Sequence, residues 1–141
     1  MANVSEIMST DVQVIEPQDT LRHAARLMQD RNVGALPVWD GNRLLGMLTD
    51  RDITIRCVAV GLDPAQTCVS DVMTADVEFC TSDQDTEEVM RLMGDQQVRR
   101  LPVLNAEGKL VGIVSLGDLA VRQNGHIDQT VREISEPGQR M

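Results

Sequence analysis

Aromatic residues are almost absent from this chain of 141 residues, which has one Trp, one Phe and no Tyr. Aliphatic residues and Met must therefore fill the core, and the aromatic platforms on which single-stranded nucleic acids stack are missing. Lysine is also scarce, because all but one of the thirteen basic residues are Arg. The formal net charge of -9 argues against general DNA or RNA binding, which needs clustered cations.

Cysteine and histidine are few as well. Cys57, Cys68 and Cys80 form no CxxC pair, their number is odd, and no secretory signal or long apolar segment is recognisable. We therefore expect a reduced, cytoplasmic protein that does not enter a membrane, with Cys80 as a small core residue. A metal site would require the fold to gather these cysteines with His23 and His126, and we expect none.

The chain is an internal repeat. Val4–Val38 aligns with Val69–Val103 at an offset of 65 without a gap, and after one inserted residue RLLGMLTDRD aligns with KLVGIVSLGD. Such similarity indicates two copies of one supersecondary unit. We expect a first repeat at residues 4–62, a linker at 63–68, a second repeat at 69–125 and a C-terminal tail at 126–141.

Each copy has the pattern strand, helix, strand, strand, helix, which predicts an α/β (α+β) fold. In the first copy, apolar spacing predicts a strand at 12–15, a helix at 21–28, a hairpin of strands at 33–39 and 44–48, and a helix from residue 50 toward Gly61. The second copy repeats this order, and its last helix is expected to fade around 123–125. One unit of about sixty residues buries little apolar surface, so we expect the copies to pack about a pseudo-twofold axis with a groove between them.

The closing segments of the two copies, LLGMLTDRD at 44–52 and LVGIVSLGD at 110–118, are the most informative motif. In each, an apolar strand interrupted by glycine leads to a hydroxyl residue and, three positions later, to an aspartate. A strand that runs into a helix start offers free backbone N–H groups and the positive end of a helix dipole. The pattern therefore predicts two related binding sites, although such an aspartate can also serve only to stabilise the first helical turn.

These motifs resemble the CBS domain family, and the two tandem copies resemble a Bateman module. The resemblance covers about Val4 to Gln123 and depends on three features per copy: the opening IMSTDV or VMTADV, the strand start VGALPV or VRRLPV, and the closing G-x-x-[ST]-x-x-D. The layout is similar to small stand-alone CBS-pair proteins of bacteria, including the hypoxic response type. The resemblance implies β-α-β-β-α repeats with an adenosine-containing ligand, such as AMP, ADP, ATP, NAD or S-adenosylmethionine, in the groove between them.

The resemblance also implies roles for individual residues. The closing aspartate would accept hydrogen bonds from the ribose, the Thr or Ser would help to hold phosphate, and adenine would meet the backbone of the other repeat. A diol does need an acceptor of this kind, and a phosphate does need hydroxyl, N–H and guanidinium donors. By position, one site would contain Thr49, Asp52, Val77, Glu78, Val98 and Arg100, and the other Ser115, Asp118, Val12, Gln13, Val33 and Gly34, with Arg99 as a further candidate.

The strand starts differ between the copies, since the second has Arg99 and Arg100 where the first has Gly34 and an alanine. Cations for both phosphate tails would then come mainly from the second copy. This favours the site of Thr49 as the better phosphate site, although an inward-pointing Glu78 would oppose phosphate there.

We therefore predict a regulatory module without catalytic activity that needs no cofactor and binds an adenine nucleotide as a regulatory ligand. A homodimer is expected, through the apolar helices at 21–28 and 89–93 and those after the two closing aspartates. The sequence does not identify the effector protein that the module would regulate. The alternative is a CBS pair that binds no nucleotide and serves protein interaction or dimerisation. An enzyme using Cys57 or the pair Asp50 and Asp52 is disfavoured, because no base, metal set or oxyanion-forming motif accompanies them.

Overall fold

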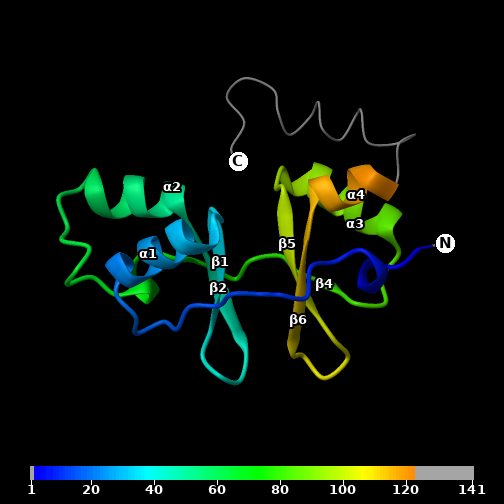
Figure 1. Ribbon diagram of the computed structural model, residues 1–141, viewed down its shortest axis with the longest axis horizontal. Helices are drawn as coiled ribbons and strands as arrows, with labels where there is room; N and C mark the ends of the chain where they lie inside the picture. Colours follow the sequence, from blue (N-terminus) through cyan, green and yellow to red (C-terminus); the bar gives the residue numbers. More distant parts are fainter. Residues whose placement is uncertain (1, 123–141) are drawn as a thin grey trace. The chain divides into compact units, whose positions relative to one another are not determined.

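The computed structural model describes residues 2–122 and divides into two compact units, which we describe one at a time (Figure 1). The repeat-1 unit is Gln13–Val77, and the repeat-2 unit combines Met1–Val12 with the chain from Glu78 onward. The compact units therefore differ from the sequence repeats. The opening segment of each repeat belongs to the unit formed by the rest of the other repeat.

The repeat-1 unit contains a three-stranded antiparallel sheet, and its two longer helices lie to one side of the sheet's hairpin (Figure 1). The hairpin of β1 (Ala35–Trp39) and β2 (Leu44–Thr49) was predicted, whereas β3 (Thr74–Ala75), which pairs with the other edge of β2, was not. The helices of this unit are α1 (Leu21–Arg31), α2 (Asp50–Ile53), the π-helix η2 (Thr54–Val58) that continues α2, and the short 3-10 helix η3 (Val69–Asp71).

Local sequence explains the boundaries of these elements. The hairpin turn forms because Asp40 Oδ1 accepts the backbone N–H groups of Arg43 and Asn42, both at 2.8 Å, and because Gly41 takes φ 95°. The N–H of Arg43, followed by that of Asn42, lowers the pKa of the Asp40 carboxyl, since both bonds favour the charged form. α1 begins where the Thr20 hydroxyl accepts a backbone N–H at 3.1 Å.

The repeat-2 unit is built around a similar antiparallel hairpin and helices, but its third strand lies on the other edge of the hairpin. Its elements are the 3-10 helix η1 (Val4–Glu6), β4 (Cys80–Thr81), α3 (Thr86–Gln96), β5 (Arg100–Leu104), β6 (Leu110–Ser115) and α4 (Leu116–Arg122). In its sheet β4 runs parallel to β5, and β5 and β6 form an antiparallel hairpin. The prediction of two copies of a mixed α/β unit is confirmed.

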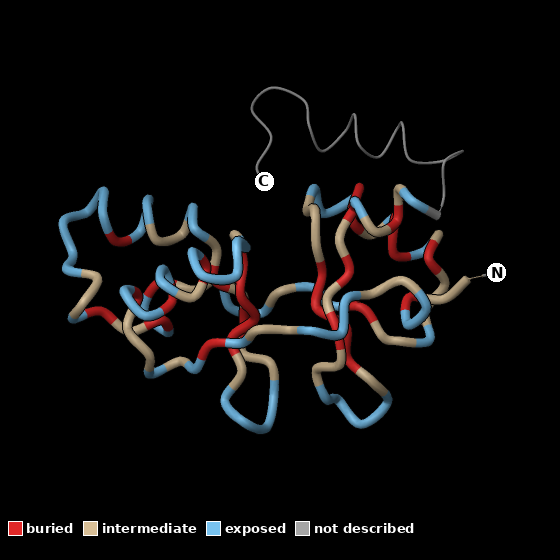
Figure 2. Tube along the Cα trace, viewed as in Figure 1, coloured by how far each residue is buried: buried red, intermediate tan, exposed pale blue. Residues whose placement is uncertain are grey.

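Each unit has its own hydrophobic core, seen as the red segments of Figure 2. Val4, from the N-terminal segment, is fully buried in the repeat-2 core, and Val69 and Val72 are buried in the repeat-1 core. Burial of these side chains explains why the opening segment of each repeat belongs to the opposite unit. The apolar faces of α1 and α3 are also buried, including Met28 and Met93.

The glycine of each closing motif is required by close packing of these exchanged segments. A Cβ on Gly46 would overlap the carbonyl oxygen of Thr74 and lie 3.1 Å from its carbonyl carbon. In the repeat-2 unit, Ser9 and Ile113 exchange two backbone hydrogen bonds of 2.8 and 2.9 Å, and a Cβ on Gly112 would lie 2.9 Å from the Ser9 carbonyl oxygen. Only glycine therefore lets an exchanged segment lie against the strand.

The strand predicted at 12–15 does not form a continuous ladder. It is reduced to one isolated bridge between Ile15 and Val38, and Val14 is 37% exposed. The end of the last helix and the tail at 126–141 lie outside the described residues.

Candidate functional site

The two closing motifs form nearly identical structures, which we call the repeat-1 corner (Thr49–Asp52) and the repeat-2 corner (Ser115–Asp118). In the repeat-1 corner, Thr49 Oγ1 accepts the backbone N–H of Asp52 at 3.1 Å, and Asp52 Oδ2 accepts the backbone N–H of Thr49 at 3.0 Å. The same pair of bonds in the repeat-2 corner measures 3.1 and 2.9 Å. Each hydroxyl and aspartate thus form a capping box that fixes both side chains.

All backbone N–H groups of the repeat-1 corner are used within the protein, which corrects the expectation of free donors there. Besides the two N–H groups of the capping box, the N–H of Asp50 donates to the Gly34 carbonyl oxygen at 3.0 Å. The N–H of Arg51 donates to Asp50 Oδ1 at 2.8 Å. An anion could bind backbone groups here only by displacing these bonds.

Each corner nevertheless presents side-chain groups to a ligand. Among the described residues, Oδ1 of Asp52 and Oδ1 of Asp118 have no hydrogen-bond partner, and both side chains are half-buried. The hydroxyls of Thr49 and Ser115 accept an N–H and keep an O–H that can donate. A fixed carboxylate oxygen beside a hydroxyl suits a ligand with its own hydroxyl groups, because little side-chain freedom remains to be lost on binding.

Each strand start lies beside the corner of its own repeat. The β1–β2 register pairs Ala35 with Thr49, and the β5–β6 register pairs Arg100 with Ser115. The N–H of Leu116 also donates to the carbonyl oxygen of the residue before Arg100, at 2.7 Å. The arginine-bearing strand start is therefore adjacent to the repeat-2 corner, and the glycine-bearing one to the repeat-1 corner.

The other predicted site residues lie outside the corners. Val33 is 41% exposed, and Val98 packs partly against the repeat-2 core. The remaining four flank the two points where the chain passes from one unit to the other, between Val12 and Gln13 and between Val77 and Glu78. The assignment of each corner to residues of the other repeat stays a prediction.

Sequence reasoning assigned no binding role to Asp50, and it did not consider Arg56. Asp50 stands where the second repeat has Leu116, so an alignment of the two corners could have shown the change of charge. Arg56 Nη1 donates to the carbonyl oxygens of Val72 and Met73, at 3.1 and 3.3 Å. No local pattern predicts this contact, which ties η2 to the segment leading into β3.

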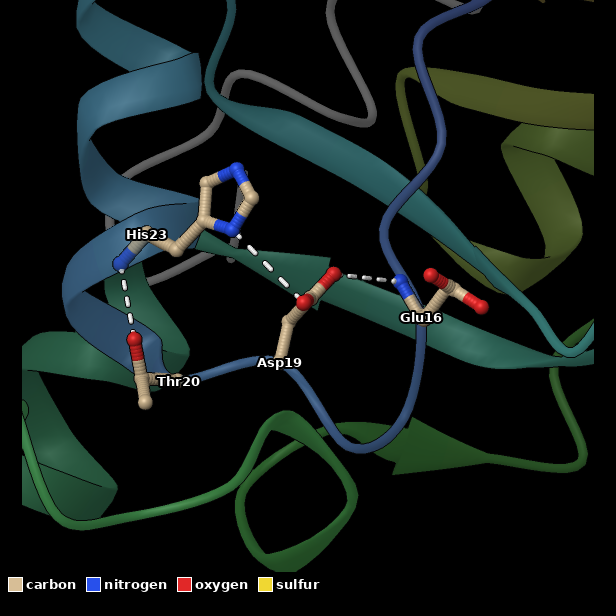
Figure 3. A network of polar contacts seen from close by, with 4 residues as sticks. All are labelled: Glu16, Asp19, Thr20 and His23. Carbon is tan, nitrogen blue, oxygen red and sulfur yellow. Dashed lines mark hydrogen bonds and ion pairs between the residues drawn. The ribbon is translucent and has the colours of Figure 1, made fainter.

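A separate polar network surrounds the start of α1 (Figure 3). Asp19 Oδ2 accepts the backbone N–H of Glu16 at 3.1 Å, and its Oδ1 lies 3.6 Å from His23 Nδ1. The His23 side chain is exposed. A pocket of about 300 Å³ there contains none of the predicted site residues and is lined by Thr20, Arg22, His23 and Arg26. These contacts stabilise the start of the helix and do not extend the corners.

The cysteines are free thiols. Cys80 is 1% exposed, which confirms it as a core residue, and burial raises the pKa of its thiol to about 12. Within residues 2–122, no group of three or more His, Cys, Asp or Glu side chains is placed to hold a metal ion, and His126 lies outside this range. In the same part of the chain no helix has the length and apolar character to span a membrane.

Two α/β units with a duplicated hydroxyl–aspartate corner define a tandem-repeat protein. The family model for the CBS domain matches residues 4–58 and 69–124. The chain belongs to the CBS domain family, and the resemblance stated from its motifs is confirmed.

Several relatives match this chain over most of their own length. The CBS domain-containing protein YhcV of Bacillus subtilis is 46% identical over 87% of this chain and 86% of its own length. A crystal structure of Hypoxic Response Protein I with two coordinated zinc ions has a TM-score of 0.79 and 36% identity, covering 86% of this chain and 98% of that one. A crystal structure of CBSX2 in complex with AMP has a TM-score of 0.74 and 27% identity, covering 86% and 95% respectively.

Proposed function

We propose that the chain is a non-catalytic regulatory module that binds an adenosine-containing ligand at the two corners, each completed by residues of the other repeat. AMP, ADP, ATP, NAD and S-adenosylmethionine are the candidate ligands. Occupancy would be signalled by a change in the arrangement of the repeats, and the ligand must therefore bind one arrangement more tightly than the other. The three free cysteines favour a cytoplasmic location for this module.

The observation that supports this proposal most directly is the partner-free Oδ1 of each corner aspartate. The ribose of an adenosine ligand has two hydroxyl groups that need acceptors, and a carboxylate oxygen held by its neighbour provides one without reorganisation. The hydroxyl three residues earlier can donate to a phosphate or to a ribose oxygen. The AMP complex of the related protein CBSX2 supports the choice of adenosine ligands.

Thermal shift on protein freed of co-purified nucleotide tests the proposal. Each candidate ligand is added in turn, and at least one should raise the melting temperature. A ligand at a hundredfold excess over its Kd adds about 2.7 kcal/mol, which corresponds to a shift of several degrees. No shift with any of the five ligands would reject the proposal.

Substitution of the corner aspartates locates the site. In Asp52→Asn and Asp118→Asn, the amide oxygen can still accept the backbone N–H of the capping box, but an amide donor then faces the ribose. Loss of a hydrogen bond to a charged acceptor should raise Kd about tenfold or more at the altered corner, while the melting temperature of the free protein stays close to wild type. An unchanged Kd in the double variant would place the ligand elsewhere.

A second candidate function is protein interaction or homodimerisation without a nucleotide. The helix that follows the repeat-1 corner exposes Ile55 and Val58, at 44 and 60%, and the turn after it exposes Val60 and Leu62, at 65 and 46%. In contrast, the apolar faces of α1 and α3, which were also candidates for a dimer surface, are used in the cores. Exposed apolar side chains gathered on one helix and the turn after it favour a contact with a partner surface.

Sedimentation analysis tests this second candidate. Val58→Asp places a charge in the middle of the exposed apolar residues and should convert a dimer to a monomer without loss of helix content. As a control, an exposed polar residue of the same helix is changed in Thr54→Asp. If wild type is a monomer at all concentrations, or if both variants keep its oligomeric state, this surface is not the dimer contact.

A further inference from the structure

The two corners share one backbone geometry but differ in one pair of side chains. In each, the second corner residue donates its N–H to a carbonyl oxygen of the strand start of the same repeat: Asp50 to Gly34 at 3.0 Å and Leu116 to Arg99 at 2.7 Å. The facing pair is therefore glycine and aspartate in the repeat-1 unit, and arginine and leucine in the repeat-2 unit. One corner serves as an internal control for the other.

The position of the Asp50 carboxylate depends on glycine at position 34. Asp50 Oδ2 lies 3.1 Å from the point that a Cβ on Gly34 would occupy, and Oδ1 accepts the N–H of Arg51 at 2.8 Å. A side chain at position 34, such as the arginine of the second repeat, would force the carboxylate to move. Glycine and aspartate at these positions thus form a coupled pair that keeps a negative charge at the strand start.

This pair of residues changes the charge beside the hydroxyl and the aspartate, which are otherwise equivalent in the two corners. The repeat-1 corner has two carboxylates, of Asp50 and Asp52, and one exposed guanidinium between them. The repeat-2 corner has one carboxylate, and the strand start beside it contributes Arg99 and Arg100, whereas Leu116 is buried in the core. A phosphate tail is therefore opposed at the first corner and attracted at the second.

We propose that Asp50 is a specificity-determining residue, which makes the repeat-1 corner select adenosine ligands with little or no phosphate charge and leaves phosphate-bearing ligands to the repeat-2 corner. This inference rests on the proposed function. It runs opposite to the sequence prediction that the site of Thr49 is the better phosphate site, because that prediction did not include the Asp50 charge. Adenosine, AMP and ATP, which share base and ribose and differ in phosphate charge, are suitable probes.

Calorimetric titrations without Mg²⁺ test the inference one corner at a time. In the Asp118→Asn background, which weakens the repeat-2 corner, Kd should increase from adenosine to ATP. Adding Asp50→Asn keeps an oxygen that can accept the Arg51 N–H but removes the charge. It should lower the Kd for ATP about threefold to tenfold, as expected when one like charge is removed from a water-rich site. The Kd for adenosine should stay within twofold, and high salt should reduce the effect on ATP.

The matched control is Asp63→Asn, which makes the same change of net charge beyond the C-terminal end of η2. Asp63 is exposed and, like Asp50, accepts a backbone N–H, that of Ala65 at 3.0 Å. It should leave all three Kd values unchanged. If adenosine and ATP bind, but Asp50→Asn does not lower the Kd for ATP or lowers it no more than Asp63→Asn does, the proposed role of Asp50 is overturned. The proposed function is not affected by that result. Failure of all three probes to bind wild type would overturn the inference, whereas the proposed function is overturned only if NAD and S-adenosylmethionine also fail to bind.

Discussion

Replacement of Gly46 by alanine tests whether the glycine of the closing motif holds the exchanged segment. The new Cβ would overlap the carbonyl oxygen of Thr74 and lie 3.1 and 3.2 Å from two further backbone atoms of β3. Because these neighbours are backbone and cannot rotate away, β3 must separate from β2. We expect overpacking to cost about 1–3 kcal/mol, with about 1 kcal/mol more for each ladder hydrogen bond lost.

The total of about 2–4 kcal/mol corresponds to a fall in melting temperature of about 8 °C or more for a unit of this size. Urea unfolding is followed by circular dichroism, which reports on both units, and by the fluorescence of the single tryptophan, Trp39, which lies at the end of β1 in the same unit as Gly46. Gly112→Ala should cost less, since the nearest atom there is the flexible side chain of Met8.

Gly117→Ala provides the matched control. A Cβ there would lie 3.6 Å from its nearest neighbour, an ordinary contact, and alanine favours a helix over glycine by about 0.5–1 kcal/mol. The expected order of stability is Gly117→Ala at or above wild type, then Gly112→Ala, then Gly46→Ala. If Gly46→Ala unfolds at the same urea concentration as Gly117→Ala, the close packing described here does not constrain the motif.

Three further predictions concern other contacts. Arg56→Ala should speed hydrogen exchange in the segment of residues 72–75, because two carbonyl oxygens lose their donor, whereas equal exchange in wild type and variant would show that the contact does not hold this segment. Cys80 should react with a thiol reagent far more slowly than Cys68, since Cys80 is buried with a pKa of about 12 and Cys68 is partly exposed. Mass spectrometry of the labelled peptides shows which cysteine reacts first, and faster labelling of Cys80 would contradict its burial. Asp40 should titrate by NMR below its ordinary pKa, so its stabilising charge is present at neutral pH and is lost as the pH falls through the lowered value; titration at or above the ordinary value would refute the turn geometry.

Much of the local structure followed from the sequence. Helical spacing from Leu21 to Met28 predicted α1, and the apolar runs on either side of Gly41 predicted the β1–β2 hairpin. These predictions succeed because they depend on neighbours along the chain and on one buried face. The same reasoning could not find β3, whose two residues are polar or small and pair only because the exchanged segment lies against Gly46.

The sequence by itself determined that this protein contains two copies of one CBS unit, each ending in a hydroxyl and an aspartate at a fixed spacing. Tertiary structure decided how those residues are used. It showed that each closing aspartate completes a capping box with one oxygen and that the Arg51 N–H, expected to be free, donates to Asp50. It also showed that each strand start lies beside the corner of its own repeat. The physical reason is that residue spacing fixes which groups are present, whereas hydrogen-bond partners and neighbouring charges depend on strand register and on chain segments far away in the sequence.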